Sequence, residues 1–201
     1  MEKREDSRDE IRERIIDAAS ALFTRYGYGK TCMADIARDC EMSPGNLYRY
    51  FENKLEIAAQ IVRREFEREL AAQARFLTEP GLTAAERLRR YVIGEMEGTY
   101  AQLEEFPTLL EQTREVRAKR PLLVHEYLAQ SRELIAEILK MGNISGEFEF
   151  EVEDLIDTAE MIQAATLKFR YPQIHSRLTL DQLKRELDGV LDLLINGLQA
   201  D

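Results

Sequence analysis

The sequence predicts an all-α protein with about nine helices, and three observations lead to this prediction. Apolar residues recur at the three- and four-residue spacing of amphipathic helices along nearly all of the 201 residues. Glycine and proline punctuate these periodic segments and mark turns between them. Residues 146–154 alternate like a strand, but no partner strand is evident, so we interpret them as an extended loop before the next helix.

The first three helices are predicted from their apolar faces and their terminal residues. The first spans about residues 9–26 and ends at Gly27, because glycine tolerates the left-handed backbone that follows a helix. The second is short and spans 33–39. The third begins at Ser43-Pro44, a serine cap followed by proline in the first helical position, and reaches Phe51.

The rest of the chain also consists of helices. Asn53 followed by Glu56 three residues later predicts the start of a helix that continues to about residue 77. Turns then delimit three helices of about 20, 12 and 20 residues. Two long helices close the chain, at about residues 153–171 and 181–196, and each carries an apolar stripe.

Composition excludes several classes of protein. The chain is 44% apolar and 33% charged, which is too apolar for a disordered protein. No apolar run approaches the roughly 18 residues needed to cross a bilayer, and the charged N-terminus is not a secretory signal. Cys32 and Cys40 do not form a zinc site, and we expect no cofactor or metal. We therefore expect a cytoplasmic protein without a membrane partner.

The charge is distributed unevenly along the chain. The net charge is −10, but residues 1–54 carry 10 basic and 11 acidic residues and contribute only −1. An acidic protein is a poor ligand for DNA phosphates, whereas a locally neutral N-terminal part can still present a cationic face.

The segment 31–51 has the layout of a helix-turn-helix, in which two short helices are joined by a tight turn and the second enters the major groove of DNA. Leu47 and Phe51 fit an inward face. The residues left to face outward or sideways are Ser43, Gly45, Asn46, Tyr48, Arg49 and Tyr50. Asparagine can bond adenine, arginine can bond guanine, and tyrosine hydroxyls reach phosphates. Pro44 and Gly45 lack bulk, so the start of this helix can approach the groove closely.

Three stretches of this region resemble the N-terminal domain of TetR/AcrR-family transcriptional regulators. They are Gly27-Tyr28-Gly29-Lys30-Thr31, Asp35-Ile36-Ala37 and the run from Met42 to Lys54. The resemblance covers about residues 7–68 and implies an all-helical homodimer. It also implies a C-terminal domain in which a small molecule binds and moves the two DNA-reading helices out of register.

The resemblance also implies roles for single residues. Tyr48 and Lys54 correspond to phosphate contacts, together with Thr31 near the second helix. Gly45 and Asn46 correspond to positions near the bases, joined by Tyr50 and Arg49. Cys32 departs from the family pattern, because serine or threonine usually caps the second helix there; we expect the cap to shift to Thr31.

Two domains follow from this interpretation. A DNA-binding domain spans 7–54, with its helix-turn-helix at 31–51 and the start of a linking helix at 54–68, and a helical ligand-binding and dimerisation domain spans 55–201. The apolar stripes of the last two helices are candidates for the dimer interface. The predicted interface residues are Leu155, Ala159, Ile162, Leu183, Leu187, Val190, Leu191, Leu194 and Leu198.

The effector pocket is predicted from mixed polar and apolar residues of the middle and later helices. The candidates are Tyr91, Met96, Tyr100, Thr113, Tyr127, Gln163 and Thr166. The predicted function is a DNA-binding transcriptional regulator, a repressor that a small-molecule effector releases from a palindromic double-stranded operator. The alternative is a helical small-molecule binding module without DNA activity. An enzyme is disfavoured because no convergent acid–base set is present.

Overall fold

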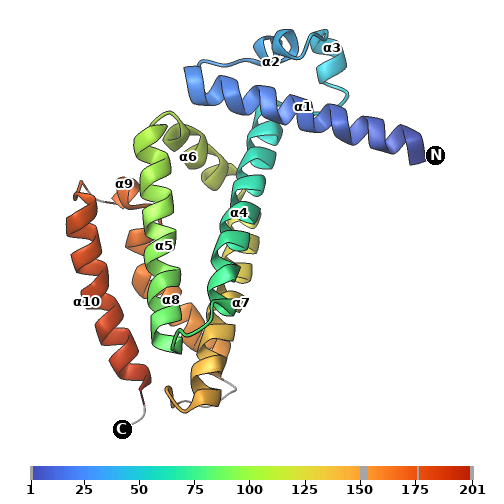
Figure 1. The fold of residues 1–201 in the computed structure, drawn as a ribbon. Helices are drawn as coiled ribbons and strands as arrows, with labels where there is room; N and C mark the ends of the chain where they lie inside the picture. Colours follow the sequence, from blue (N-terminus) through green and yellow to red (C-terminus); the bar gives the residue numbers. More distant parts are fainter. Residues whose placement is uncertain (1, 150–153, 176, 200–201) are drawn as a thin grey trace. The chain divides into compact units, whose positions relative to one another are not determined.

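The computed structural model describes residues 2–149, 154–175 and 177–199, and helices account for most of them (Figure 1). The helices are α1 (Glu2–Tyr26), α2 (Met33–Asp39), α3 (Pro44–Leu47), α4 (Lys54–Thr78), α5 (Ala84–Glu105), α6 (Leu109–Lys119), α7 (Pro121–Ser145), α8 (Leu155–Arg170), α9 (Pro172–His175) and α10 (Leu180–Leu198). The all-α prediction is confirmed. The short α9 was not predicted, since proline was expected only to end the helix before it. None of the described helices combines the length and apolar character needed to cross a bilayer.

The chain forms two compact units, and each is assembled from two separate stretches. The first contains Met1–Glu67 and Glu105–His125, and the second contains Arg68–Glu104 and Glu126–Asp201. Helix α4 therefore contributes to both units, and α6 belongs to the first although it follows α5 in the sequence.

In the first unit, α2 and α3 pack on α1 around a small apolar core. Phe23 of α1, Ile36 of α2 and Leu47 of α3 are each 0% exposed. Helix α1 ends as predicted at Gly27, whose φ of 90° is accessible to glycine without strain. The turn between α2 and α3 places Glu41 at a φ of 56°, a left-handed conformation that residues other than glycine rarely adopt.

Helix α3 is shorter than predicted. Its α-helical hydrogen bonding ends at Leu47, and the backbone N–H groups of Arg49 and Tyr50 bond carbonyls three residues back. Such bonds tighten a helix end into a narrower turn. The chain therefore continues as hydrogen-bonded turns to Phe51, the residue where we expected the helix to end.

The caps of α2 and α4 differ in how well they were predicted. Asn53 caps α4 as expected, because its Oδ1 accepts from the Glu56 amide at 3.0 Å. The expected shift of the α2 cap to Thr31 is wrong. Cys32 is the N-cap residue, and its amide donates to the Asp35 carboxylate at 3.0 Å. The acidic residue three positions after the cap thus compensates for the poor acceptor at position 32.

Helix α6 packs against the turn between α1 and α2. Glu111 accepts from the Gly29 amide at 3.1 Å, and Thr108 donates to the Thr24 carbonyl at 2.8 Å. A Cβ at Gly29 would lie 2.6 Å from the Glu111 carboxylate, so glycine permits this close approach. These contacts join residues more than 80 positions apart and were not predicted.

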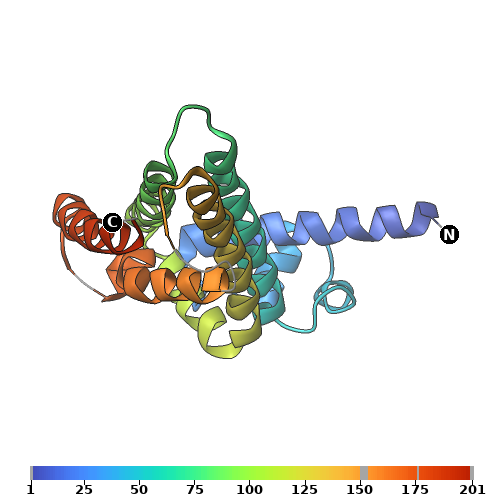
Figure 2. The same ribbon diagram turned by 90° about the horizontal axis from the view of Figure 1, so that it is seen from below.

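The second unit has a core built from α5, α7, α8 and α10, and Figure 2 shows α8 and α10 side by side. Phe148 from the loop after α7 also belongs to this core, since it is 2% exposed. The Phe148 ring packs directly on Gly142, where a Cβ would be only 2.1 Å from the ring.

The period-two stretch after α7 is an extended loop, as predicted, up to the last described residue. Phe148 forms an isolated antiparallel bridge with Gln199, just beyond α10, and this partner was not foreseen. The Glu147 carboxylate accepts from the amides of Ala84 and Ala85, at 2.6 and 3.0 Å. This loop therefore caps α5, a contact that the sequence did not predict. Residues 150–153 of the predicted stretch lie outside the described residues.

Candidate nucleic-acid interface and buried polar cluster

Helix α3 stands on the surface of the first unit and is anchored by one apolar side chain. Leu47 is fully buried, whereas Ser43, Pro44 and Gly45 are exposed and Tyr48 is 53% exposed. The Ser43 hydroxyl accepts from the Asn46 amide at 3.2 Å, so the predicted cap is confirmed. The face with the size and polarity to contact DNA is therefore open to solvent.

The turn after α3 is fixed by a residue that we did not predict. The Arg12 guanidinium of α1 donates to the Tyr50 carbonyl at 2.7 Å and lies 4.2 Å from the centre of the Phe51 ring. Arg49 is exposed and Tyr50 is half-buried on this turn. The weak sequence signal for Arg12 was its place on α1 next to the apolar face.

Two predicted phosphate contacts have intramolecular roles. Thr31 is 3% exposed and its hydroxyl donates to the Gly27 carbonyl at 3.0 Å, so this side chain has a partner within the chain and its phosphate contact stays a prediction. The Lys54 ammonium donates to the carbonyls of Tyr28 and Thr31, at 2.6 and 2.7 Å, and lies 4.2 Å from the Tyr28 ring centre. Burial lowers the pKa of Lys54, although the nearby Glu111 carboxylate opposes this effect.

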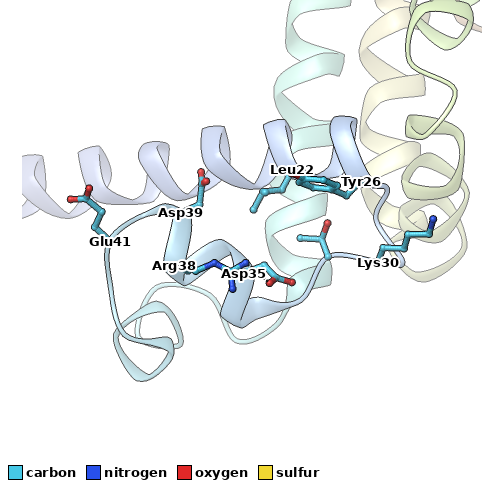
Figure 3. Close-up of a pocket in the computed structure, with 8 residues that line it drawn as sticks. Leu22, Tyr26, Lys30, Asp35, Arg38, Asp39 and Glu41 are labelled. Carbon is cyan, nitrogen blue, oxygen red and sulfur yellow. Dashed lines mark hydrogen bonds and ion pairs between the residues drawn. The ribbon is translucent and has the colours of Figure 1, made fainter.

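An open groove of about 620 Å³ separates the end of α1 from α2 (Figure 3). Leu22 and Tyr26 extend into it from α1, and Asp35 and Arg38 border it from α2. Arg38 pairs with Asp35 at 2.8 Å. Carboxylates and cations alternate along this groove, so it does not form the uniformly cationic surface that phosphates require.

The interior of the second unit holds a connected cluster of polar side chains. Three predicted pocket residues belong to it: Tyr91, Tyr127 and Gln163 are 0%, 3% and 8% exposed. Ser131 joins two of them, since its hydroxyl oxygen lies 2.8 Å from the Tyr91 hydroxyl and 3.0 Å from the Gln163 amide nitrogen. The Tyr127 hydroxyl oxygen lies 3.0 Å from the Glu95 carboxylate and 2.9 Å from the Glu69 carboxylate, so its single proton is shared between the two.

A buried ion pair completes this cluster. Arg170 and Glu95 are 5% and 7% exposed, and the guanidinium Nη2 lies 2.9 Å from the Glu95 carboxylate. Burial by itself would lower the pKa of Arg170, but the Glu95 carboxylate more than offsets this and the pKa is raised. We had not predicted either residue. The signal that could have revealed Glu95 is a charged residue on the apolar face that also carries Tyr91 and Thr99.

The other predicted pocket residues lie outside this cluster. Met96 is fully buried in the apolar core, and the Thr166 hydroxyl donates to the Ile162 carbonyl within α8 at 2.8 Å. The Tyr100 carbonyl accepts from Gln173 at 2.9 Å. Thr113 belongs to α6 in the first unit, and not to the unit that holds the other candidates.

Comparison with known families identifies both parts of the chain. Residues 15–61 match the family model described as bacterial regulatory proteins, tetR family. Residues 84–191, more than half of the chain, match the model described as a tetracyclin repressor-like C-terminal domain. The chain belongs to the tetR family.

Curated relatives of this tetR-family chain are transcriptional regulators. The regulator HbdR of an Aromatoleum strain is 29% identical over 141 residues, which is 69% of this chain and 60% of HbdR. The repressor KstR of Mycobacterium tuberculosis is 25% identical over 94% of this chain and 83% of KstR.

Solved structures confirm the tetR-family fold. A TetR-family regulator of Mesorhizobium loti superposes with a TM-score of 0.72 at 18% identity, over 96% of this chain and 98% of that chain. SmeT, the repressor of a Stenotrophomonas maltophilia multidrug efflux pump, superposes with a TM-score of 0.68 at 23% identity, over 94% and 91% of the two chains.

The nine predicted dimer residues of this tetR-family chain fall into two groups by burial. Five of the nine are buried in the core of their own unit: Ala159, Ile162, Leu183, Leu187 and Leu191. The remaining four, Leu155, Val190, Leu194 and Leu198, are half-buried against that core. An apolar stripe on an amphipathic helix faces the protein interior first, so the five buried residues pack within their own chain, whereas the four half-buried ones stay predictions for the interface.

Proposed function

We propose that this tetR-family chain is a cytoplasmic transcriptional repressor that binds a palindromic DNA operator as a homodimer and is released by a small molecule. The observation that carries the proposal is the exposed α3, anchored by Leu47 and presenting Tyr48 and Arg49 to solvent. A short exposed helix after a tight turn is the element that helix-turn-helix proteins insert into the major groove.

Repression is favoured over activation by the names of the relatives. The Mycobacterium tuberculosis protein named a repressor, KstR, matches over nearly the whole of this chain. A second KstR, from Rhodococcus jostii, is 34% identical over 84 residues, and those residues are 38% of that protein. Release by an effector is supported by the buried polar cluster in the second unit, because polar groups inside a helical domain can select a ligand.

The exposed positions support different roles in DNA binding. Tyr48 is exposed, so its hydroxyl can contact a phosphate. Gly45 leaves open space where a side chain would stand. Asn46, Arg49 and Tyr50 are the candidates for base contacts. Lys54 contributes first by fixing the turn between α1 and α2, and its phosphate contact stays a prediction.

We propose that the dimer interface lies on the outer faces of α8 and α10. Four large apolar side chains remain exposed there: Ile156, Met161 and Leu167 on α8, and Leu193 on α10, are 46%, 66%, 46% and 77% exposed. Leu193 lies between Gly189 and Gly197, one turn away on either side, and no atoms crowd these glycines. A partner helix can therefore approach this face closely. Two-fold symmetry then requires two half-sites about one turn of DNA apart, or somewhat more.

A mobility-shift experiment tests the DNA-binding function. Purified protein is titrated into DNA fragments flanking its own gene at low salt, with unrelated DNA of equal length as the control. A retarded species on one fragment, which weakens as salt rises, supports the proposal. The alternative, a helical ligand-binding module, predicts no selective shift on any fragment. Selection from random DNA would then either yield a palindrome or refute operator binding.

A further inference from the structure

The polar cluster of the second unit contains a buried donor without an acceptor. Arg170 is 5% exposed, and its hydrogen bonds to Glu95 and Ser131 both come from Nη2, at 3.2 and 3.1 Å. The other terminal nitrogen, Nη1, is buried and finds no hydrogen-bond partner among the described residues. A buried donor of this kind is costly, so it requires an explanation.

The neighbours of Arg170 fix the guanidinium but offer it no further acceptor. The Ser131 hydroxyl already lies within hydrogen-bond distance of Arg170, Gln163 and Tyr91, which uses its one proton and two lone pairs. The centre of the Tyr127 ring lies 5.2 Å from the guanidinium carbon. The unpartnered nitrogen is therefore held in place by its surroundings before any ligand arrives.

Two more buried acceptors of the second unit lack donors, one on α4, which also carries Glu69, and one on α9, which follows α8. The side-chain oxygens of Gln73 in α4 and Gln173 in α9 are buried and unpartnered among the described residues. Gln73 follows Glu69 by one helical turn, and Glu69 accepts from the Tyr127 hydroxyl at 2.9 Å. Gln173 follows Arg170 by three residues. A hydroxyl group is both an acceptor and a donor, so it can accept from the arginine while it donates to a second group.

The charge of the cluster excludes ionic ligands. Two carboxylates, Glu69 and Glu95, flank the Tyr127 hydroxyl, and one cation, Arg170, offsets only one of these two negative charges. An anion bound at Nη1 would add a third negative charge to a buried region, which carries a high cost. A cation cannot accept a hydrogen bond from the guanidinium. An uncharged acceptor adds no charge to the buried region and can still accept a hydrogen bond from the guanidinium.

We propose that Arg170 is the polar anchor of the effector site, and that the effector is an uncharged, largely apolar molecule whose hydroxyl oxygen accepts a hydrogen bond from Nη1. This inference rests on the proposed function and adds the chemical class of the effector to it. The Tyr127 ring lies 5.2 Å from the anchor, and Tyr91 is joined to it through the Ser131 hydroxyl.

Four probes that share one ring system test the proposal: 2-naphthol, naphthalene, 2-naphthoate and 2-naphthylmethylammonium, titrated at pH 7 with binding followed by fluorescence. The protein is expected to bind 2-naphthol about tenfold or more tightly than each of the other three, since a hydrogen bond to a charged donor has that effect. Equal or tighter binding of the anion or the cation, or binding of no probe, would overturn the proposal.

Paired variants keep the test independent of folding. Arg170→Met alone would leave Glu95 buried without a cation, so the test variant is Arg170→Met combined with Glu95→Gln. The matched control is Lys168→Met with Glu186→Gln, which removes an exposed ion pair between α8 and α10. Circular dichroism verifies that both fold. The preference for 2-naphthol over naphthalene is expected to vanish in the test variant and persist in the control; persistence in both would overturn the proposal.

Operator binding by the same wild-type preparation separates this inference from the proposed function. Operator binding without a preference for 2-naphthol refutes the effector class and leaves the repressor function standing. The preference without operator binding refutes the repressor function and supports the ligand site.

Discussion

At the residue scale, the proposed DNA-binding face needs both room for the DNA backbone and side chains that can contact it. Gly45 meets the first need and Tyr48 the second. Gly45 contributes open space, because no atom lies within 4 Å of the position where a Cβ would stand. Tyr48 contributes a half-exposed hydroxyl on the same short segment. The first residue permits close approach to the groove, and the second offers a contact once the approach is made.

Gly45→Ala is expected to weaken operator binding about tenfold or more without harming the fold. Alanine stabilises a helix by roughly 0.5–1 kcal/mol relative to glycine, whereas the added methyl obstructs the groove. Gly98→Ala in α5 is the matched control, since that position is equally open. Thermal unfolding and fluorescence anisotropy measure the two properties. Unchanged affinity in Gly45→Ala would show that α3 does not approach DNA at this residue.

Asn46→Ala and Tyr48→Phe are expected to affect different properties of operator binding, the first its sequence specificity and the second its overall affinity. The asparagine variant should lose about 1–3 kcal/mol of discrimination at one base pair, because asparagine can make a bidentate contact to adenine and alanine cannot. The tyrosine variant should lose affinity equally on all operator variants, because phosphates carry no sequence information. A panel of single-base operator substitutions measures both. A uniform loss in Asn46→Ala would contradict the base contact.

At the element scale, the ends of the helices depend on groups far away in the chain. Helix α5 begins under the Glu147 carboxylate, which lies more than 60 residues later in the sequence. The turn between α1 and α2 depends in the same way on Glu111 of α6. Such caps satisfy amides that a helix cannot satisfy by itself.

Glu147→Ala is expected to lower the free energy of unfolding by about 1 kcal/mol. The change leaves two amides at the start of α5 without their acceptor and removes a negative charge from the positive end of the helix dipole. Glu149→Ala, two residues later on the same loop, is the control because its side chain is exposed. Urea denaturation followed by circular dichroism compares them; equal stability of the two variants would argue against the cap.

At the scale of the whole molecule, the protein must be a dimer to bind both half-sites of a palindromic operator. The exposed apolar residues of α8 and α10 are the surface that the core leaves uncovered. Burying such a surface against a second copy is the physical reason to expect a two-fold dimer.

Leu193→Glu is expected to produce monomers that fold normally and bind the operator weakly. Leu193 is 77% exposed, so the change costs one chain little, but it places two charges in the interface of a dimer. Ile144→Glu on α7, where the side chain is 78% exposed, is the control and should remain dimeric. Analytical ultracentrifugation measures the mass of each. A Leu193→Glu dimer would place the interface elsewhere.

The sequence by itself determined most of the helices of this protein, though not the short α9, and the position of its DNA-reading helix. Helix periodicity and capping residues such as Ser43 and Asn53 act over a few neighbouring residues, so they can be recognised in the sequence. The same local rules located α2, and they also placed Leu47 on an inward face.

The tertiary structure alone decided which side of each helix is hidden and which polar groups meet. An apolar stripe on α10 predicts that Leu187 is covered, but not whether its own chain or a partner covers it. Arg170 and Glu95 lie 75 residues apart and on different helices, and only packing brings their charges to 2.9 Å. Local hydrogen bonding depends on residues that are close in the sequence. Burial and charge pairing depend on surfaces that exist only after the helices have packed.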